Sequence, residues 1–567
     1  MIQNWKLKEV VTEEFREKNP KLSALQAQLL WNRGIVDDSS LQAFLDPKYE
    51  QLHDPFLFQD MSKAVDRIWK AIDSGEKMLV YSDYDADAIT AAAVLSQTFR
   101  YLKTECGNYI PDRFTEGYGL NISAFELLKS QGVRVVITVD CGTNSVEIAE
   151  FCKKNGIDLI ITDHHEITGP IPDSFALINP KNPDDVYPYH QITGVGVAYK
   201  LAKALLKDTE KVRSRVPSYV EGWDKWLLDL VAIGTVADCH SLIGENRILV
   251  SCGLKVLAKT KWPGLRVLLE LAGVDKVNSE TLGFTLAPRI NAAGRLEHAS
   301  LALDVLVAED VGLAQELATR LEKTNERRKD LTARILSEAR EVAEKNQDRK
   351  VLVLSHASWH KGLVGIVAGK LAGEYSRPVV VLEQGEFEAT GSVRSFGSFN
   401  TVAALKSAED TLLRFGGHKE AAGLTLQSTK IEAFREKMLL YADSVENNEE
   451  EISGELILEA ELSPGEISLA SVKEINLLEP FGSDNEKPVF AIHNAKPVSL
   501  KRIGKDKSHL QAKFQIGNRF VDAIGFGKGY LADSLSLDVP ISLAGELIED
   551  TWNGNTRVKL RIVDVKF

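Results

Sequence analysis

The chain has 567 residues, of which 44% are hydrophobic and 26% are charged, an ordinary composition for a globular protein. This length exceeds what one hydrophobic core usually supports, so several domains are expected. The net charge of −13 argues against a surface that coats nucleic acid nonspecifically. It does not exclude a local basic track, because salt screens each charge within about 8–10 Å.

Membrane and disulfide signals are weak in this sequence. No stretch approaches the roughly 20 apolar residues that a membrane-spanning helix needs, and the first residues lack the apolar core of a signal peptide. Neither paired zinc spacing nor a disulfide framework is formed by the five cysteines, Cys106, Cys141, Cys152, Cys239 and Cys252. We therefore expect a cytoplasmic protein with no membrane partner.

The first half of the chain predicts a helical N-terminal region and then an α/β domain. Residues 1–60 are expected to be helical and partly irregular, with Pro47 and Pro55 as breakers. Over about 61–240, within a domain expected at 61–310, apolar runs alternate with helical stretches such as 89–102 and 146–155. Alternation of this kind predicts βαβ units and a parallel sheet.

The second half predicts a connecting helix, a second α/β domain and a small barrel. Residues 311–346 are rich in charge with Leu and Ala at helical spacing, which favours a long helix joining two lobes. A second α/β domain is predicted at 347–445, followed by an acidic linker at 446–451. Over 453–567 short strands are separated by turns such as Asn553-Gly554, which predicts an OB-fold β-barrel.

Three polar clusters directly follow apolar runs. Asp83-Tyr84-Asp85-Ala86-Asp87 follows residues 78–80, Asp140 follows 135–139, and Asp163-His164-His165 follows 159–161. Continuous apolar, β-branched runs are typical of buried parallel strands. Each cluster is therefore expected at the carboxyl edge of the sheet, where open α/β sheets bind ligands.

The residue types in these clusters predict a metal centre. Several carboxylates brought together repel one another unless cations lie between them. The candidate ligands are oxygens and one imidazole, a mixture that suits Mn²⁺ or Mg²⁺ better than a closed zinc site: Asp83, Asp85, Asp87, Asp140, His164 and Asp238. Each cluster alone is also typical of a surface turn, but three at successive strand ends favour a metal site.

The same clusters carry a family resemblance. Asp163-His164-His165 is similar to the motif that names the DHH phosphoesterase superfamily, with its associated DHHA1 domain, and the rest of the chain resembles the RecJ family within it. The further segments that carry the resemblance are 110–120, 194–198, 234–238, 245–247, 287–295, 359–362, 391–395, 416–423 and 480–482. One departure is Tyr81, since many DHH phosphoesterases have a histidine ligand at that position.

This resemblance implies a two-metal hydrolytic site. It implies that two divalent ions, Mn²⁺ by preference with Mg²⁺ as the alternative, are held by the candidate ligands named above. Those of direct catalytic importance would be Asp85, Asp87, Asp140, His164, His165 and Asp238. His165 is then expected to face the scissile phosphate, and Asp163 to orient the histidines.

Candidate substrate contacts lie further along the chain. Arg289, Asn291 and Arg295 are expected in a Gly-containing loop where guanidinium groups grip phosphate oxygens. Arg113, Ser392 and Arg394 resemble the family's pocket for a 5′ phosphate. The remaining candidates are His165 and His418 as substrate contacts, Tyr118 and Trp359 as stacking platforms, and the basic Lys501, Arg502, Lys505 and Lys507 in the barrel.

The function implied is a single-stranded-DNA-specific 5′→3′ exonuclease that releases 5′-mononucleotides in DNA repair and recombination. Its implied partners are single-stranded DNA, a RecQ-type helicase and a single-strand-binding protein, and its implied state is a monomer. Two alternatives stay open. One is a DHH phosphodiesterase for short oligonucleotides or cyclic dinucleotides, against which the barrel counts; the other is a non-catalytic single-strand-binding scaffold, against which the intact acidic set counts.

Overall fold

The computed structural model describes residues 4–117, 119–346, 348–445, 455–552 and 554–567. The chain divides into two compact units. The first holds the described residues up to Ala287, with Leu306–Val311 and Glu455–Phe567; the second holds Pro288–Val305 and the described residues from Gly312 onward to 445. Tyr118, the predicted linker at 446–451 and the first residue of the predicted Asn553-Gly554 turn lie outside the described residues. Among the helices described, none is both long and apolar enough to cross a membrane.

The first unit contains the predicted parallel sheet. Its five strands are all parallel and lie in the order β3 (Gly107–Tyr109), β2 (Met78–Ser82), β4 (Val135–Val139), β5 (Asp158–Thr162) and β6 (Ala176–Ile178). Every residue of β2 and β4 is buried, as expected for strands covered on both faces. The predicted α/β parallel-sheet fold is confirmed.

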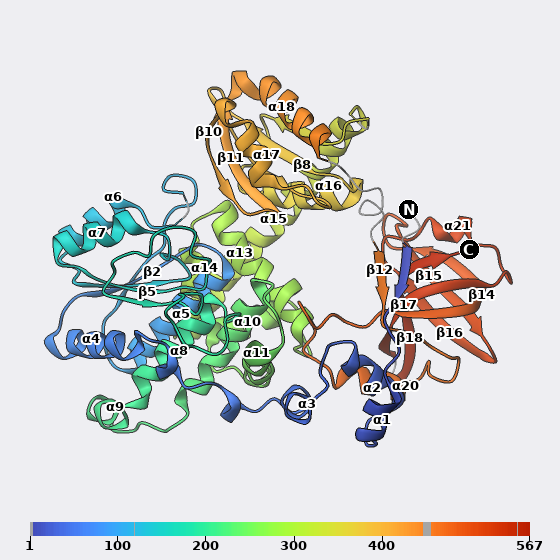
Figure 1. Cartoon of the computed structure of the whole chain (residues 1–567), viewed down its shortest axis with the longest axis horizontal. Helices are drawn as coiled ribbons and strands as arrows, with labels where there is room; N and C mark the ends of the chain where they lie inside the picture. The colour runs from blue at the N-terminus through green and yellow to red at the C-terminus, as the bar shows by residue number, and fades with distance from the viewer. Residues whose placement is uncertain (1–3, 118, 347, 446–454, 553) are drawn as a thin grey trace. The chain divides into compact units, whose positions relative to one another are not determined.

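Helices cover both faces of this sheet (Figure 1). On one face, α6 (Ile122–Ser130) and α7 (Val146–Asn155) supply Phe125 and Ile148 to a core shared with β2, β4 and β5. On the other face, three helices contact one another: α5 (Ala86–Tyr101), α8 (Gly194–Lys207) and α10 (Leu228–Ala237). Further helices of this unit are α4 (Met61–Ser74), α9 (Thr209–Arg215), α11 (Gly244–Leu257) and α12 (Pro263–Leu271).

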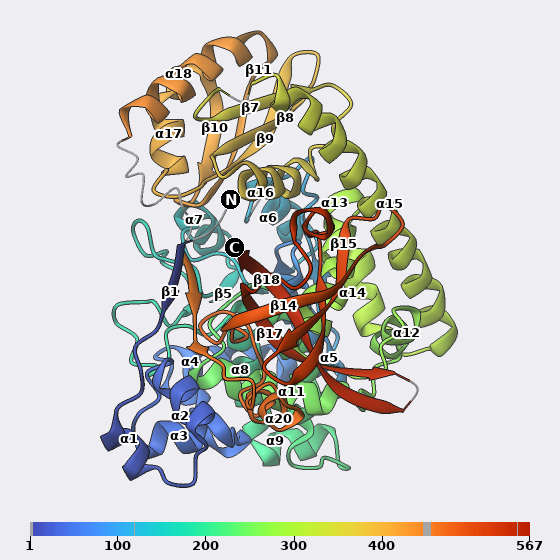
Figure 2. The same cartoon turned by 90° about the vertical axis from the view of Figure 1, so that its right-hand side faces the viewer.

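The C-terminal part of the first unit is a closed barrel, as predicted. Strand β14 (Phe490–Ile503) pairs with both β15 (His509–Ile516) and β17 (Ile541–Trp552), which closes the sheet. The circle is completed by β16 (Arg519–Gly525) and β18 (Asn555–Lys566). Figure 2 shows these strands facing the viewer. Short elements beside them are β12 (Glu455–Leu458), β13 (Ala460–Glu461), α20 (Leu469–Asn476) and α21 (Leu531–Ser534).

The N-terminal region belongs to the core of this barrel. It contains the predicted helices, α1 (Glu13–Lys18), α2 (Ala24–Trp31) and α3 (Asp38–Leu45), but it begins with a strand that the sequence did not predict, β1 (Asn4–Leu7). This strand pairs in parallel with β12. Phe15 and Leu30 share one apolar cluster with Phe490 and Phe514 of the barrel. Segments more than 450 residues apart in the sequence therefore fold together.

The second unit is a smaller α/β domain. It includes most of the 34-residue helix α15 (Val311–Glu344), as predicted, preceded by α13 (Ala287–Leu296) and α14 (Ser300–Val307). Its sheet has the order β10 (Leu412–Gly417), β11 (Ala421–Gln427), β9 (Glu388–Arg394), β8 (Val379–Gln384) and β7 (Leu352–His356), with only β7 and β8 parallel. The sheet is covered by α16 (Val364–Tyr375) and α15 on one face and by α17 (Thr401–Ser407) and α18 (Ile431–Ser444) on the other.

Candidate metal centre

The carboxyl edge of the parallel sheet carries all three predicted clusters. Asp83 directly follows β2, Asp140 directly follows β4, and Asp163 directly follows β5. Because β2, β4 and β5 are neighbours in one parallel sheet, their carboxyl ends lie side by side. Asp140 has a φ of +59°, a left-handed backbone that is uncommon outside glycine and that turns the chain sharply at the edge.

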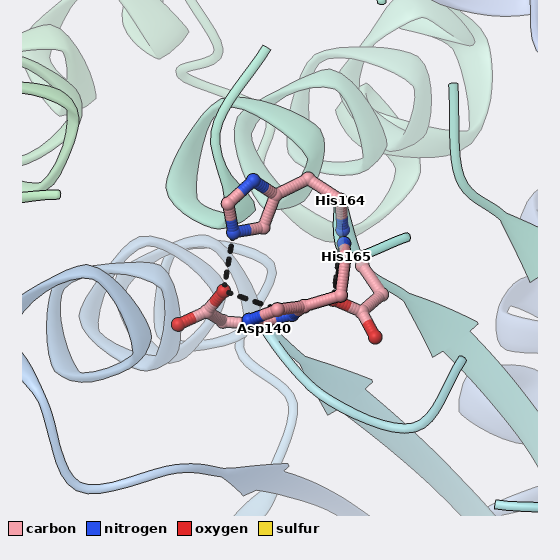
Figure 3. A group of neighbouring side chains, drawn as sticks. Asp140, His164 and His165 are labelled. Carbon is pink, nitrogen blue, oxygen red and sulfur yellow. Dashed lines mark hydrogen bonds and ion pairs between the residues drawn. The ribbon is translucent and has the colours of Figure 1, made fainter. Parts of the chain in front are cut away.

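His164 lies at the centre of the cluster. Its Nε2 is 3.0 Å from Oδ1 of Asp140, 3.7 Å from Oδ2 of Asp238 and 3.9 Å from Oδ2 of Asp87. Figure 3 shows the imidazole pointing at the Asp140 carboxyl, and the same oxygen, Oδ1, lies 4.0 Å from Nδ1 of His165. Asp238 is the residue directly after α10, so a helix end and two strand ends meet at this imidazole.

Asp87 is held in the first turn of α5 by the start of α8. Its two carboxyl oxygens accept hydrogen bonds from the backbone N–H groups of Gly194 (2.8 Å) and Val195 (3.0 Å). Two glycines make room for the acids: a Cβ at Gly194 would lie 2.5 Å from Oδ1 of Asp140, and one at Gly234 would lie 2.7 Å from Oδ1 of Asp87. The segments 194–198 and 234–238 therefore contribute close backbone approach as well as the predicted ligand Asp238.

Asp163 interacts with the two histidines that follow it, and one of its carboxyl oxygens also lies within 4.8 Å of a carboxyl oxygen of Asp140. Its Oδ1 accepts a hydrogen bond from the backbone N–H of His164 (2.7 Å) and interacts with Nδ1 of His165 at 2.7 Å. Its Oδ2 accepts the backbone N–H of Thr143 at 2.9 Å. Burial opposes ionisation of this carboxyl, but the hydrogen bond and charge of His165 lower its pKa, so it stays an anion. Conversely, Asp163 raises the pKa of His165 to about 9 despite burial.

The other acids are strained electrostatically. Burial raises the pKa of Asp87 and of Asp140 well above the usual range, and neighbouring carboxylates, Asp85 among them, raise both further. Burial and then the Asp85 charge raise the pKa of Asp83 to about 8 and that of Asp238 to about 7. Four carboxyls thus resist ionisation together, and divalent cations relieve this because they stabilise the anions.

The donor atoms present fit divalent ions. Within the described part of the chain, the buried Oδ1 of Asp83 has no hydrogen-bond partner, so it is available to a cation. Burial lowers the pKa of His164 well below its usual range, which keeps the imidazole neutral as a metal ligand must be. Asp85 caps α5 through Oδ1, which accepts the N–H of Ala88. The cluster is therefore suited to hold Mn²⁺ or Mg²⁺.

His240 is a member of this site that the sequence did not reveal. Its Nε2 lies 2.9 Å from Nδ1 of His164 and 3.3 Å from Oδ2 of Asp238. One nitrogen or oxygen atom each of His164, Asp238 and His240 lies within 4.8 Å of the other two. Burial, followed by the charge of Lys181, lowers the pKa of His240 to about 4. The only signal in the sequence was its position two residues after a predicted ligand.

Two predicted features of the first unit lie beside the cluster. The guanidinium of Arg113 lies over the ring of Tyr84, 4.8 Å from its centroid, and its charge acts on Asp83. Tyr81 is fully buried in β2 and its hydroxyl donates to the carbonyl of Gly119 at 3.1 Å. Tyr81 is thus bound elsewhere, while Asp83 supplies an acid at the end of the same strand.

The second unit brings Ser392 and Arg394 together. Nη1 of Arg394 donates to Oγ of Ser392 (2.5 Å) and to the carbonyl of Val393 (2.9 Å). A Cβ at Gly365, the second residue of α16, would lie 3.1 Å from Nη2 of Arg394. A guanidinium and a hydroxyl beside the start of a 12-residue helix suit an anion. Arg113 belongs to the other unit, so the predicted grouping of the three stays a prediction.

Two expectations for the second unit were wrong. Arg289, Asn291 and Arg295 lie on helix α13, not in a loop, because Gly294 is surrounded by helix-forming residues. Arg289 forms a two-point ion pair with Glu322 of α15, at 2.5 and 3.1 Å. Trp359 is no stacking platform, since it is 1% exposed and its Nε1 donates to Glu338 at 2.8 Å.

The last two predicted substrate contacts are Arg295 and His418. Arg295 donates to the carbonyl of Gly362 at 3.4 Å. His418 is exposed, and its carbonyl accepts the hydroxyl of Thr401 at 2.6 Å. Neither observation tests a role in substrate binding, so these roles stay predictions.

Comparison with known families defines the class of this protein. A model of the DHH family N-terminal domain matches residues 77–235, which hold the sheet, Asp163-His164-His165 and most of α10. A model of the DHHA1 domain matches residues 348–443 in the second unit. Sheet edge, acidic cluster and second domain together are those of a DHH-type phosphoesterase.

The barrel and full-length relatives narrow this class. A model of the RecJ OB domain matches residues 458–564. The single-stranded-DNA-specific exonuclease RecJ of Bacillus subtilis is 39% identical over 550 residues, covering 96% of this chain and 68% of that protein. Two crystal structures of RecJ from Thermus thermophilus match all of this chain. The Mn²⁺ complex has a TM-score of 0.84 and 30% sequence identity, and the match covers 79% of that chain. The Mg²⁺ complex has a TM-score of 0.78 and 29% sequence identity, and the match covers 78% of that chain. The chain belongs to the RecJ family.

Proposed function

We infer that this protein is a metal-dependent exonuclease that hydrolyses single-stranded DNA. The observation that carries the inference is the cluster around His164, in which buried acids at strand and helix ends resist ionisation without cations. Relatives that align with more than nine-tenths of this chain are named single-stranded-DNA-specific exonucleases. We further propose 5′→3′ polarity and release of 5′-mononucleotides.

The proposed ligands are those predicted from the sequence: Asp83, Asp85, Asp87, Asp140, His164 and Asp238. When bound by these residues, divalent ions would supply Lewis-acid activation of water and stabilisation of negative charge at the phosphate. The chain's own part is to hold these groups in place. Backbone N–H groups of α8 fix Asp87, and the glycine at 194 leaves Asp140 in the position where it meets His164.

His165 is proposed to face the scissile phosphate. Its Nδ1 is held by Asp163, and its pKa of about 9 keeps it protonated at neutral pH in the absence of cations. A protonated imidazole donates to a phosphate oxygen and balances its charge. Asp163 therefore orients His165 and supports its charge.

Substrate contacts are proposed in both units. Ser392 and Arg394 are proposed to bind the 5′ phosphate together with Arg113, since a hydroxyl and guanidinium forks match phosphate oxygens. Arg289, Asn291, Arg295 and His418 are proposed to contact the DNA backbone. The barrel is proposed to track the single strand through its basic turn at 504–508.

The wider setting is proposed from the family. We propose that the regions 1–60, 61–310, 311–346, 347–445 and 453–567 act as the N-terminal, DHH, connecting-helix, DHHA1 and OB parts. We also propose a cytoplasmic monomer that acts in DNA repair and recombination, with a RecQ-type helicase and a single-strand-binding protein as partners.

A substrate panel tests the activity. Purified protein with Mn²⁺ is given 5′-³²P-labelled single-stranded DNA, duplex DNA and a dinucleotide, and products are resolved at single-nucleotide resolution. Rapid release of labelled mononucleotide from the long single strand supports the proposal. Preference for the dinucleotide would indicate a small-substrate phosphodiesterase, and tight binding with the label retained would indicate a scaffold; each contradicts the proposal.

A further inference from the structure

The loop that follows Asp238 places a second imidazole behind the proposed ligand His164. Cys239 has a φ of +57°, which reverses the chain directly after α10. His240 consequently turns back toward the cluster, with its ring at 72° to that of His164 and 4.8 Å between centroids. Its Nε2 reaches Nδ1 of His164, whereas the other ring nitrogen of His164 meets Asp140.

This contact bears on which nitrogen of His164 carries the proton. A neutral imidazole has one N–H and one lone pair, and only the tautomer protonated at Nδ1 leaves the Nε2 lone pair for a cation. Metal-binding histidines usually donate their other N–H to a nearby acceptor, which fixes both tautomer and ring orientation. Here the atom within hydrogen-bond distance of Nδ1 is Nε2 of His240, at 2.9 Å.

We propose that His240 is a positioning residue that accepts a hydrogen bond from Nδ1 of His164 and so aims Nε2 of His164 at the metal ions. His240 itself is then protonated on Nδ1 and does not bind the ions. This inference rests on the proposed metal site, and it concerns a residue outside the predicted ligand set.

The loop is fixed from the C-terminal part of the first unit. The hydroxyl of Ser483 donates to the carbonyl of Cys239 at 2.5 Å, and the N–H of Leu242 donates to the carbonyl of Ser483 at 2.8 Å. Gly482 lets the Leu242 side chain close in, since a Cβ there would lie 2.5 Å from Cδ1 of Leu242. The residues on both sides of His240 in the sequence, Cys239 and Leu242, are thus hydrogen-bonded to a segment that leads into the barrel.

A buried arginine holds that segment in turn. Arg247 of α11 is 1% exposed and donates to the carbonyls of Leu478 (3.0 Å) and Glu479 (2.8 Å). These bonds join α11 to the segment that leads into the barrel. Their acceptors are main-chain carbonyls, which carry no ionisable group. The C-terminal region therefore contributes to the alignment of His164, besides its proposed role with DNA.

The test measures Mn²⁺ binding by the full chain, by electron paramagnetic resonance of free Mn²⁺, and needs no activity. His240→Leu removes the acceptor and is expected to weaken Mn²⁺ binding about 10- to 100-fold, the usual cost of losing such a partner. His240→Gln places an amide oxygen near the same position and should keep binding within about threefold. Ser483→Ala loosens the loop and should fall between the two. Equal affinity of His240→Leu and wild type would overturn the proposal.

Pulsed EPR separates positioning from direct ligation. Electron spin echo modulation of bound Mn²⁺ should report one coordinated imidazole in wild type and in His240→Gln; two in wild type and one in the variant would make His240 a ligand and overturn the proposal. His356→Leu is the matched control, because this exposed histidine also bonds a neighbour, Ser358, at 2.9 Å. Because binding is read without substrate, failure of the exonuclease assay would leave this result interpretable.

Discussion

The two α/β sheets of this chain collect opposite charge by different routes. In the first unit, parallel strands end side by side and deliver Asp83, Asp140 and Asp163 to one edge. In the second unit, antiparallel β9 presents Ser392 and Arg394 two residues apart on the face that meets α16. One arrangement demands cations and the other suits an anion, although the net charge of −13 hints at neither.

This difference shows that local geometry decides the ligand. The acids of the first sheet are buried among one another, so burial and like charge raise their pKa values together. Nη1 of Arg394 instead donates to a hydroxyl and to a carbonyl. The comparison predicts that variants in the two sheets fail in different assays.

Asp140→Asn should give the largest effect. Asparagine keeps the shape but removes the charge nearest His164, and we expect exonuclease turnover to fall on the order of 1,000-fold, as for the loss of a central electrostatic group. Because burial already opposes ionisation of Asp140, the metal-free variant should melt no lower than wild type. Mononucleotide release and thermal unfolding measure the two effects.

Asp66→Asn is the control for that variant. Asp66 is exposed on α4, away from the sheet edge, so both turnover and melting temperature should match wild type. If Asp140→Asn turned over substrate near the wild-type rate, the acids of the first sheet would not be needed for catalysis. The proposed difference between the two sheets would then be wrong.

Arg394→Ala should affect selection rather than chemistry. Hydrogen bonds to charged groups contribute roughly 1.5–3 kcal/mol, so preference for a 5′-phosphorylated over a 5′-hydroxyl strand should drop about 10- to 100-fold. Competition between the two oligonucleotides measures this ratio. Arg340→Ala, which removes an exposed ion pair with Glu374 on the same unit, should leave it unchanged. An unaltered preference in Arg394→Ala would show that the second sheet does not read the phosphate.

The pH dependence of stability should depend on metal. Asp83 and Asp238 have pKa values of about 8 and 7 in the folded chain and near 4 when unfolded, so above pH 7 the folded state holds more protons. His165, with a pKa of about 9, acts in the same direction. A state that binds more protons loses stability as pH rises. His164 and His240 act oppositely below about pH 7, where their unfolded forms are protonated. Lys200 and Lys261, whose pKa values burial lowers to about 8, act oppositely above pH 7, but they do so with and without metal.

The expected result is a widening gap between two melting curves. From pH 7 to 8.5 the melting temperature of the EDTA-treated protein should fall by about 2–4 °C relative to that of the Mn²⁺-loaded protein, kept under argon. Thermal scans by circular dichroism at four pH values measure this. A difference between the two curves that stays constant over the same interval would show that the acids are not held in an electrostatically unfavourable cluster.

The sequence predicted the parallel sheet well because its signals are local. An apolar run followed by acids marks a strand end wherever it occurs, and helix α7 was predicted with the bounds the structure gives. Signals that depend on distant partners were missed. Strand β1 has four residues and exists because β12, about 450 residues away, pairs with it. The glycine in residues 287–295 predicts a loop, whereas the structure has a helix there, whose Arg289 pairs with Glu322 of α15.

The candidate site was predictable to the same extent. Asp140 and His164 follow strands, so topology alone brought them together. His240 follows no strand, and its position depends on the turn at Cys239 and on Ser483, 244 residues beyond that turn, neither of which a local pattern contains. The prediction that Trp359 stacks on bases was wrong. The residues next to it in the sequence do not indicate that it is buried in the second unit and hydrogen-bonded to Glu338.

The barrel differs from both sheets because it is basic and, among its described residues, has no buried cluster of charged side chains. Substitutions of its basic residues should give the smallest effect on function. Lys505 and Lys507 are exposed on the turn between β14 and β15, and among the described residues neither forms an ion pair, whereas nearby Arg502 pairs with Asp533. Charges of this kind attract phosphates through released counterions.

Lys505→Gln with Lys507→Gln should raise the Kd for single-stranded DNA severalfold and lower the slope of log K against log salt by about 1.4, or 0.7 per lost contact. Fluorescence anisotropy with catalytically inactive Asp140→Asn protein measures both, and Lys63→Gln with Lys70→Gln on α4 serves as the control. An unchanged slope would mean that the turn does not touch DNA, which would leave the sheets of the two units as the regions that bind substrate.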